Sequence, residues 1–127
     1  MSRRLRAKAD ALLAAERGTI IKNGGVSVSI ALAYPNTYAV GMSNLGVHQI
    51  YSVLNSRKDT VCERVFLPDE EDREEYAKSG TRLFTLESRR PVSDFDIVAF
   101  SVAFEQDYLN VLEMLRLARI PAKRSGR

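Results

Sequence analysis

Short apolar runs along the chain predict its strands. Residues 26–32 alternate apolar with small side chains and the run stops at Pro35, which indicates a strand buried on at least one face. Residues 61–67 and 82–86 are further short runs rich in β-forming residues. Residues 95–104 read FDIVAFSVAF, an almost continuous apolar run of the kind that a parallel strand covered on both faces requires. We therefore expect residues 95–104 to form the central strand of a sheet.

Apolar residues at helical spacing predict helices around these strands. The first occupies residues 5–17, and the second begins after Ser43, which we expect to be its N-cap. The acidic segment 69–78 is predicted to be a solvent-facing helix, and residues 105–119 form the last helix before Pro121. Two apolar stripes are expected to face the core: Val47, Ile50, Tyr51 and Leu54 in the second helix, and Tyr108, Val111, Leu112, Leu115 and Ala118 in the last.

Strands and helices alternate along the chain, which indicates an α/β fold with a largely parallel sheet and right-handed crossovers. Ligands bind such sheets beyond the carboxyl ends of the strands, where two loops diverge. The loops that qualify are Tyr34–Asn44, which leads onto a helix N-terminus suited to an anion, and Ser101–Glu105. The alternative interpretation is that Pro35, Gly41 and Ser43 serve only as turn and capping residues.

Composition and charge exclude several classes of protein. A chain of 127 residues, 45% hydrophobic and 28% charged, has the size and composition of one soluble globular domain. The net charge is +3, but the basic residues gather at the two ends and no aromatics are interleaved with them, so we expect no nucleic-acid binding. No apolar run approaches the roughly 20 residues that cross a bilayer. With one cysteine and no secretion signal, a cytoplasmic location is expected.

Few residues could carry catalysis or hold a metal ion. Cys62 and His48 are the only cysteine and histidine, and one of each does not make a metal site. No Walker loop, GxGxxG, GxSxG or HExxH motif is present. Cys62 lies in a β-rich run where a buried small residue is expected, so a small hydrolase that uses Cys62 is the weakest functional hypothesis. We predict no catalytic residue and no metal ligand in this chain.

Three segments, taken in order, resemble a known family. They read ALAYPNTYAVGMSNLGVHQIYSVLNSR, ERVFLPD and LFTLESRRPVSDFDIVAFSVAFEQDYLNVLEMLRLARIP. They resemble the N-terminal region of a bacterial and archaeal family of radical SAM proteins, and the resemblance runs from about Leu12 to Pro121. It implies a Rossmann-like (flavodoxin-like) domain over residues 21–127, with an open, mostly parallel sheet and flanking helices. Such a domain is related to cobalamin-binding domains and is placed ahead of a radical SAM barrel, and residues 1–20 would form an N-terminal helical extension.

The same resemblance implies cofactors in the barrel. That barrel carries a CxxxCxxC motif for a four-iron cluster that leaves one iron for S-adenosylmethionine. This chain, with one cysteine, lacks the motif. The iron–sulfur cluster and S-adenosylmethionine are therefore expected only in the barrel, which is supplied by the same chain or by a neighbouring gene.

Cobalamin is the cofactor that the resemblance implies for the domain itself. Domains that hold cobalamin through a histidine carry DxHxxG, and GVHQI around His48 does not match this motif. Cobalamin would thus bind without a protein histidine, or the domain keeps the fold and has lost the ligand. The residues implied for cofactor binding are Pro35, Asn36, Tyr38, Gly41, Met42, Ser43, Ser101, Phe104 and Glu105.

Two functional hypotheses follow. The leading one is a cofactor-binding or regulatory N-terminal domain of a radical SAM enzyme, not catalytic by itself. The alternative is a non-enzymatic protein-interaction module that keeps the Rossmann-like fold. A helix such as residues 105–119 normally returns to another strand, so we expect the sheet to be incomplete at its C-terminal side. An unpaired sheet edge would promote homo-oligomers as well as contact with the barrel.

Overall fold

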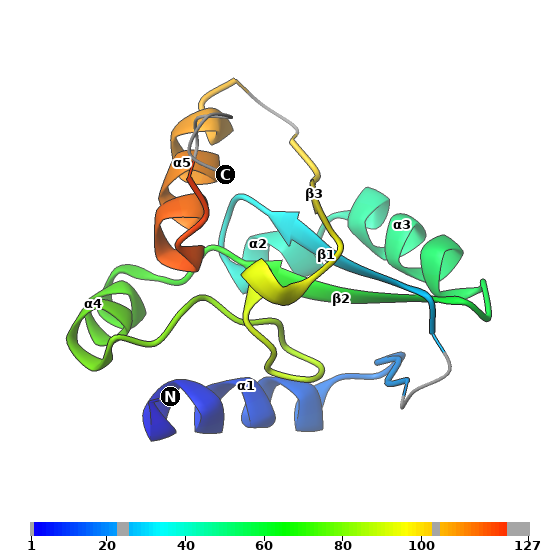
Figure 1. Cartoon of the computed structure of the whole chain (residues 1–127), viewed down its shortest axis with the longest axis horizontal. Coiled ribbons are helices and arrows are strands. Elements are labelled where there is room, and N and C mark those ends of the chain that lie inside the picture. The colour runs from blue at the N-terminus through cyan, green and yellow to red at the C-terminus, as the bar shows by residue number, and fades with distance from the viewer. Residues whose placement is uncertain (1, 23–25, 103–104, 122–127) are drawn as a thin grey trace.

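A three-stranded parallel sheet lies at the centre of the fold. In the computed structural model of the chain (Figure 1), β1 (Val28–Tyr34) lies between β2 (Thr60–Phe66) and β3 (Ile97–Phe100). β1 pairs with β2 along its whole length, and its segment Ile30–Ala33 pairs with β3. The α/β fold with an open, parallel, Rossmann-like sheet is therefore confirmed. The structure describes residues 2–22, 26–102 and 105–121.

Helices flank the sheet, and three of them begin at a side-chain cap. Ser2, Asn44 and Asp69 each accept a hydrogen bond from the backbone N–H three residues later, which satisfies a free donor of the first turn. Within the residues that the structure describes, no helix is both long enough and apolar enough to cross a membrane. The helices are α1 (Arg3–Ala15), α2 (Tyr38–Met42), α3 (Leu45–Asn55), α4 (Glu70–Ser79) and α5 (Asp107–Ala118), with a 3-10 turn at Val92–Asp94.

The sheet divides the core into two layers. On one face, Ile30, Leu32 and Tyr34 of β1 pack against Val47 and Tyr51 of α3, which confirms the inner part of the stripe predicted for that helix. On the other face, the small residues of β1 leave room for side chains from three helices and from the segment before β3. This second cluster includes Leu5, Ala9, Ala31, Ala33, Val65, Tyr76, Leu83, Phe84, Met114 and Leu117.

The apolar run at residues 95–104 does not form the central strand, and that prediction was wrong. β3 comprises only Ile97–Phe100, lies at the edge of the sheet, and leaves Ile97 48% exposed. The central position belongs to β1, which is buried from Ser29 to Tyr34. An apolar run indicates whether both faces of a strand can be buried, but it does not show where the strand lies in the sheet. Residues 103–104, at the end of the run, lie outside the described residues.

Residues 82–86 do not form the strand that was predicted. Phe84 makes a single isolated antiparallel bridge with Pro91, and the backbone N–H of Leu83 instead donates to the carbonyl oxygen of Leu117 at 3.0 Å. Leu83 and Phe84 are both buried in the core. The apolar pattern of this segment therefore reflects burial of a loop and not pairing in a ladder.

The loop after β1 contains a short helix that its sequence does not predict. α2 occupies Tyr38–Met42, and Ser43 follows its last residue with its hydroxyl bonded back to the carbonyl oxygen of Ala39 at 3.1 Å. The N-cap of α3 is Asn44 and not Ser43, since the Asn44 side chain accepts the N–H of Val47 at 3.1 Å. Serine and asparagine are both good caps, so adjacent positions cannot be separated by residue type.

The buried face of α5 also differs from the prediction. Met114, Leu117 and Ala118 are buried, whereas Tyr108 and Leu112 of the expected stripe are exposed. α5 carries apolar residues around most of its circumference, so spacing alone does not identify the face that meets the sheet.

Candidate functional site

The strand order creates a switch point at the carboxyl edge of the sheet. β2 and β3 lie on opposite sides of β1, so the loops that follow β1 and β3 diverge there. The two predicted loops both start at this edge, where the N–H of Ser101 donates to the carbonyl oxygen of Ala33 at 2.9 Å. Asn110 of α5 reaches the first loop, because its amide donates to the carbonyl oxygen of Pro35 at 3.0 Å. The structure thus brings the predicted loops to one place.

Asn36 and Tyr38, in the first loop, are engaged inside the chain. The side-chain oxygen of Asn36 accepts the N–H of Thr37 at 2.8 Å, and its backbone carbonyl accepts the N–H of Leu67 at 2.9 Å. The hydroxyl of Tyr38 donates to the carboxylate of Glu16. These hydrogen bonds fix the loop against neighbouring segments, and they occupy donors and acceptors that a ligand would need.

Gly41, Met42 and Ser43 serve the packing of α2. A Cβ atom at Gly41 would lie 2.2 Å from the ring of Phe66, so the close approach of helix and strand requires glycine. The carbonyl oxygen of Met42 lies 2.7 Å from Nε2 of His48, and Ser43 is exposed. The interpretation of these positions as turn and packing residues accounts for each of them.

The second loop is described only in part. Ser101 is half-buried and Glu105 is exposed, while Phe104 lies outside the described residues.

A cavity of about 420 Å³ lies at the carboxyl end of β2, beneath α1. Its walls are mostly apolar, and Lys8 and Asp69 meet at its rim with Nζ 3.0 Å from the carboxylate. Of the residues predicted to bind a cofactor, Tyr38 lines it. The other lining residues include Leu5, Ala9, Leu12, Val65, Tyr76 and Phe84.

Cobalamin does not fit the groups that these residues present. His48, the only histidine, is bonded to Met42 and lies in α3, so it offers no ligand to cobalt. The cavity beneath α1 is within the size range of pockets for drug-sized ligands, and a corrin ring with its nucleotide tail is larger than these. We therefore assign no residue to cobalamin.

A buried ionic cluster joins the segment after α1 to β2. The Arg64 guanidinium lies with Nη2 2.7 Å from Glu16 Oε1 and with Nε 2.8 Å from Glu87 Oε2. The three side chains are 3%, 4% and 1% exposed in that order. Arg64 also lies over the ring of Tyr51, 4.6 Å from its centroid. Two carboxylates therefore share one guanidinium in the interior.

The two carboxylates of this cluster differ in pKa. Burial raises the pKa of Glu87, and the charge of Arg64 offsets this only in part. Burial acts in the same direction on Glu16, but hydrogen bonds from Arg64, Thr19 and Tyr38 outweigh it, so the pKa of Glu16 is lowered. None of the charged members lines the cavity, and we interpret the cluster as structural.

Cys62 has the surroundings of an inert thiol. It is 0% exposed, and burial raises its pKa to about 12. Its backbone N–H and carbonyl are both bonded to the side chain of Asn55, at 2.9 and 3.0 Å. Over the part of the chain that the structure describes, no group of three or more histidine, cysteine, aspartate or glutamate side chains could hold a metal ion.

Comparison with protein families shows which family the chain belongs to. Residues 46–127 match the family described as radical SAM proteins, N-terminal. The chain belongs to this family. Comparisons with curated proteins and with solved structures gave no match. The radical SAM N-terminal match begins in α3 and extends through β2, β3 and α5, so it includes most of the sheet.

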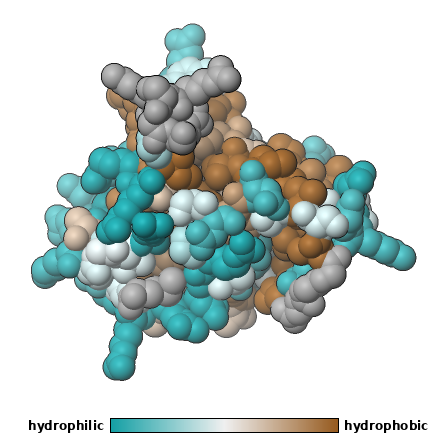
Figure 2. All heavy atoms as spheres, viewed as in Figure 1, coloured by the Kyte–Doolittle hydropathy of each residue, from teal (hydrophilic) through white to brown (hydrophobic). Residues whose placement is uncertain are grey.

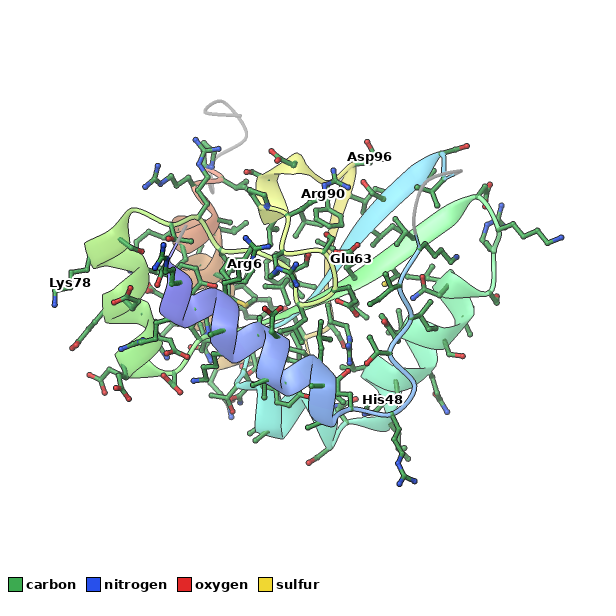
Figure 3. All side chains as sticks on the ribbon, turned by 90° about the horizontal axis from the view of Figure 1, so that it is seen from below. Arg6, His48, Glu63, Lys78, Arg90 and Asp96 are labelled. Carbon is green, nitrogen blue, oxygen red and sulfur yellow. The ribbon has the colours of Figure 1, made fainter. Side chains whose placement is uncertain are left out.

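Sequence analysis did not predict the buried ionic cluster of this radical SAM N-terminal domain, although charged residues within an apolar strand indicate it. Glu63 and Arg64 interrupt the apolar run of β2, and charged residues inside a covered strand require buried partners. Glu63, a residue of β2 outside the ionic cluster, lies inside the molecule (Figure 3). Its carboxylate accepts hydrogen bonds of 2.6 Å from both Thr85 and Ser88. The cavity carries no such signal, because its walls come from segments far apart in the sequence.

Proposed function

We propose that this chain is a non-catalytic docking domain that binds a radical SAM barrel through the exposed face of α5. The observation that carries the proposal is an apolar surface on that helix: Tyr108, Leu109 and Leu112 are 61%, 74% and 51% exposed. Figure 2 shows hydrophobic surface in the region of α5 and β3. Contiguous exposed apolar side chains of this kind are typical of protein–protein contacts.

The arrangement of the predicted loops supports docking over chemistry. Asn36, Tyr38 and Gly41 are used in hydrogen bonds and packing within the chain. Cys62 is buried, and burial raises the pKa of its thiol. The iron–sulfur cluster and S-adenosylmethionine, which the family requires for radical chemistry, would then belong to the barrel, and the present domain would supply contact surface.

Cofactor binding is the second candidate function, and the strand order favours it. The order β2-β1-β3 places a switch point between the loops that follow β1 and β3, which is where open α/β sheets bind their ligands. Cobalamin, or another ligand, would have to reach groups that are not already bonded within the chain.

The docking proposal is tested by co-purifying this chain with the radical SAM barrel encoded downstream or in a neighbouring gene. Leu109→Glu places a charge in the proposed interface, and we expect it to weaken binding about tenfold or more. Leu45→Glu is the matched control, because Leu45 is 75% exposed but lies on α3. Equal effects of the two substitutions, or none from Leu109→Glu, would contradict the proposal.

A further inference from the structure

The side chains beneath α1 leave a cavity that they do not fill. It measures about 420 Å³ and is bounded by α1, by residues 37–39 after β1, by the end of β2, and by Leu83 and Phe84. Figure 3 shows α1 lying across this side of the molecule. Protein interiors normally pack as densely as organic crystals, with few voids larger than a water molecule. This cavity is much larger than such a void, and its volume is in the range of pockets that hold small ligands.

The walls of the cavity are rich in aromatic rings. Tyr38 packs edge to face on Phe66, with 5.3 Å between the ring centroids. Tyr76 packs on Phe84 in a tilted arrangement, with 5.8 Å between the centroids. All four side chains line the cavity. Rings that meet in this way leave faces and edges on which a further ring can pack, so the walls suit an aromatic ligand.

The charged side chains of the cavity lie at its rim and are paired with one another. Lys8 donates to the carboxylate of Asp69 at 3.0 Å and to that of Asp72. Asp72 also accepts a hydrogen bond from Arg4 at 3.1 Å. A charged ligand would leave water without finding an unpaired opposite charge among these residues, which is costly. The cavity therefore suits an uncharged molecule.

Thr37 adds a hydrogen-bonding group to the apolar wall. It lines the cavity, is half-buried, and precedes α2 without capping that helix through its side chain. Among the described residues, its hydroxyl makes no hydrogen bond. A hydroxyl can donate and accept, so a ligand with either kind of group gains a hydrogen bond here.

We propose that the cavity beneath α1 is a binding site for an uncharged aromatic molecule, held by the rings of its walls and by a hydrogen bond to Thr37. This site is distinct from the docking surface and from the switch point, because no described residue of β3 or α5 lines the cavity. Docking through α5 and binding beneath α1 are thus separate properties of the chain.

Fluorescence titration of the full chain with N-phenyl-1-naphthylamine tests the proposal. This dye is aromatic, uncharged at neutral pH and brighter in apolar surroundings, and its N–H can donate to Thr37. We expect saturable binding of the dye, which should also raise the melting temperature of the chain. The related dye 8-anilinonaphthalene-1-sulfonate has the same rings and a negative charge. It should bind about tenfold more weakly or less, because its charge finds no unpaired partner.

Two tryptophan variants of α1 test whether the dye lies in the cavity. Leu12 lines the cavity, so Leu12→Trp fills part of it and should weaken dye binding about tenfold or more. Leu13 is also half-buried but does not line the cavity, so Leu13→Trp is the matched control. It should leave the affinity for the dye within about twofold of the parent. Thermal unfolding without dye checks that both variants are folded.

A pair of substitutions at Thr37 tests the hydrogen bond. Thr37→Val keeps the shape of the side chain and removes its hydroxyl, so we expect the dye to bind about fivefold more weakly. Thr37→Ser keeps the hydroxyl and should retain most of the affinity. Equal affinities of the two variants would contradict the role of Thr37 in the proposed site.

The remaining outcomes decide between the cavity and exposed apolar surface. The proposal is overturned if the uncharged dye does not saturate, or if both dyes bind equally well and Leu12→Trp changes neither. Equal weakening by Leu12→Trp and Leu13→Trp would also overturn it, since binding would then depend on α1 as a whole. Leu109→Glu should weaken docking to the barrel and leave dye binding unchanged. Loss of dye binding in Leu109→Glu would place the dye on α5 and overturn the inference without affecting the docking proposal.

Discussion

Arg64 connects the sheet, the loop before β3 and the segment after α1 through one buried side chain. Its partners Glu16 and Glu87 lie far apart in the sequence, and each bond is direct. Removing one partner of such a cluster leaves an uncompensated charge in the interior, which costs much more than the net contribution of the intact cluster. The cluster therefore contributes most to stability when the charges of Arg64, Glu16 and Glu87 are paired with one another.

The two carboxylates of the cluster should give opposite pH dependences. The folded-state pKa of Glu87 is raised above its ordinary 4.5, so between that value and the raised pKa the folded chain holds a proton that the unfolded chain has lost. The free energy of unfolding should therefore fall as pH rises through this window. Glu87→Gln lacks the titrating proton and should remove this fall, as urea unfolding at a series of pH values would measure.

Glu16→Gln provides the control with the other sign. The pKa of Glu16 is lowered, so its contribution to stability is present above 4.5 and is lost as pH falls below it. Glu16→Gln should remove a loss at low pH and leave the slope at higher pH. Parallel pH profiles for the two variants would contradict the assignment of pKa directions.

At the scale of elements, α1 is part of the core and also of the polar surface. Leu5 and Ala9 are 4% exposed and belong to the same cluster as the small residues of β1. On its outer side, Arg4 donates to Asp72 of α4 at 3.1 Å, and Arg89 donates to Asp10 at 2.7 Å. α1 thus closes one face of the sheet and forms the roof of the cavity.

Leu5→Ala should test how much α1 contributes to stability. Leu5 is buried and lines the cavity, so truncation enlarges a void that the neighbours fill only in part; we expect a loss of about 2–4 kcal/mol in the free energy of unfolding. Leu45→Ala, at an exposed position of α3, should change it by less than about 0.5 kcal/mol. Chemical denaturation measures both, and similar values for the two variants would show that α1 docks only loosely.

The elements that the sequence predicted correctly are those with local signals. α4 (Glu70–Ser79) is flanked by its N-cap Asp69 and by Gly80, whose φ of 70° suits glycine, and an acidic first turn suits the helix dipole. The strand at 82–86 and the central place of 95–104 were wrong, because pairing depends on partners that periodicity does not reveal. The stripe on α5 was wrong in part: Ala118 is buried as expected, but Tyr108 and Leu112 are exposed, because this helix is apolar on more than one side.

At the scale of the whole molecule, the location of the candidate site was predictable but its chemistry was not. The carboxyl ends of parallel strands lie at the same edge of a sheet, so the loops after β1 and β3 could be expected at one edge although the strand order could not. The contacts of Asn36, Tyr38 and Gly41 with distant residues could not be expected, because they depend on how α1, α2 and β2 meet. Those contacts decide how much of the loop is free for a ligand.

Titration with hydroxocobalamin tests the cofactor hypothesis on the whole chain. Because the first loop is bonded within the chain, we expect no saturable change in the absorption spectrum and no retention in equilibrium dialysis at high micromolar cofactor. Saturable binding that Ser101→Ala weakens and Ser43→Ala does not would favour a cofactor domain instead. Ser43 is the control because it is exposed and its hydroxyl bonds within α2.

The strand order also bears on when each surface becomes available during synthesis. β1 is made first and takes the middle of the sheet, β2 joins one side, and β3 joins the other side last. β1, α3 and β2 all precede β3 in the chain, so the residues that pair β1 with β2 leave the ribosome before those of β3. The side of β3 that faces away from β1 is the last to form, so assembly with a partner can follow folding as a separate step.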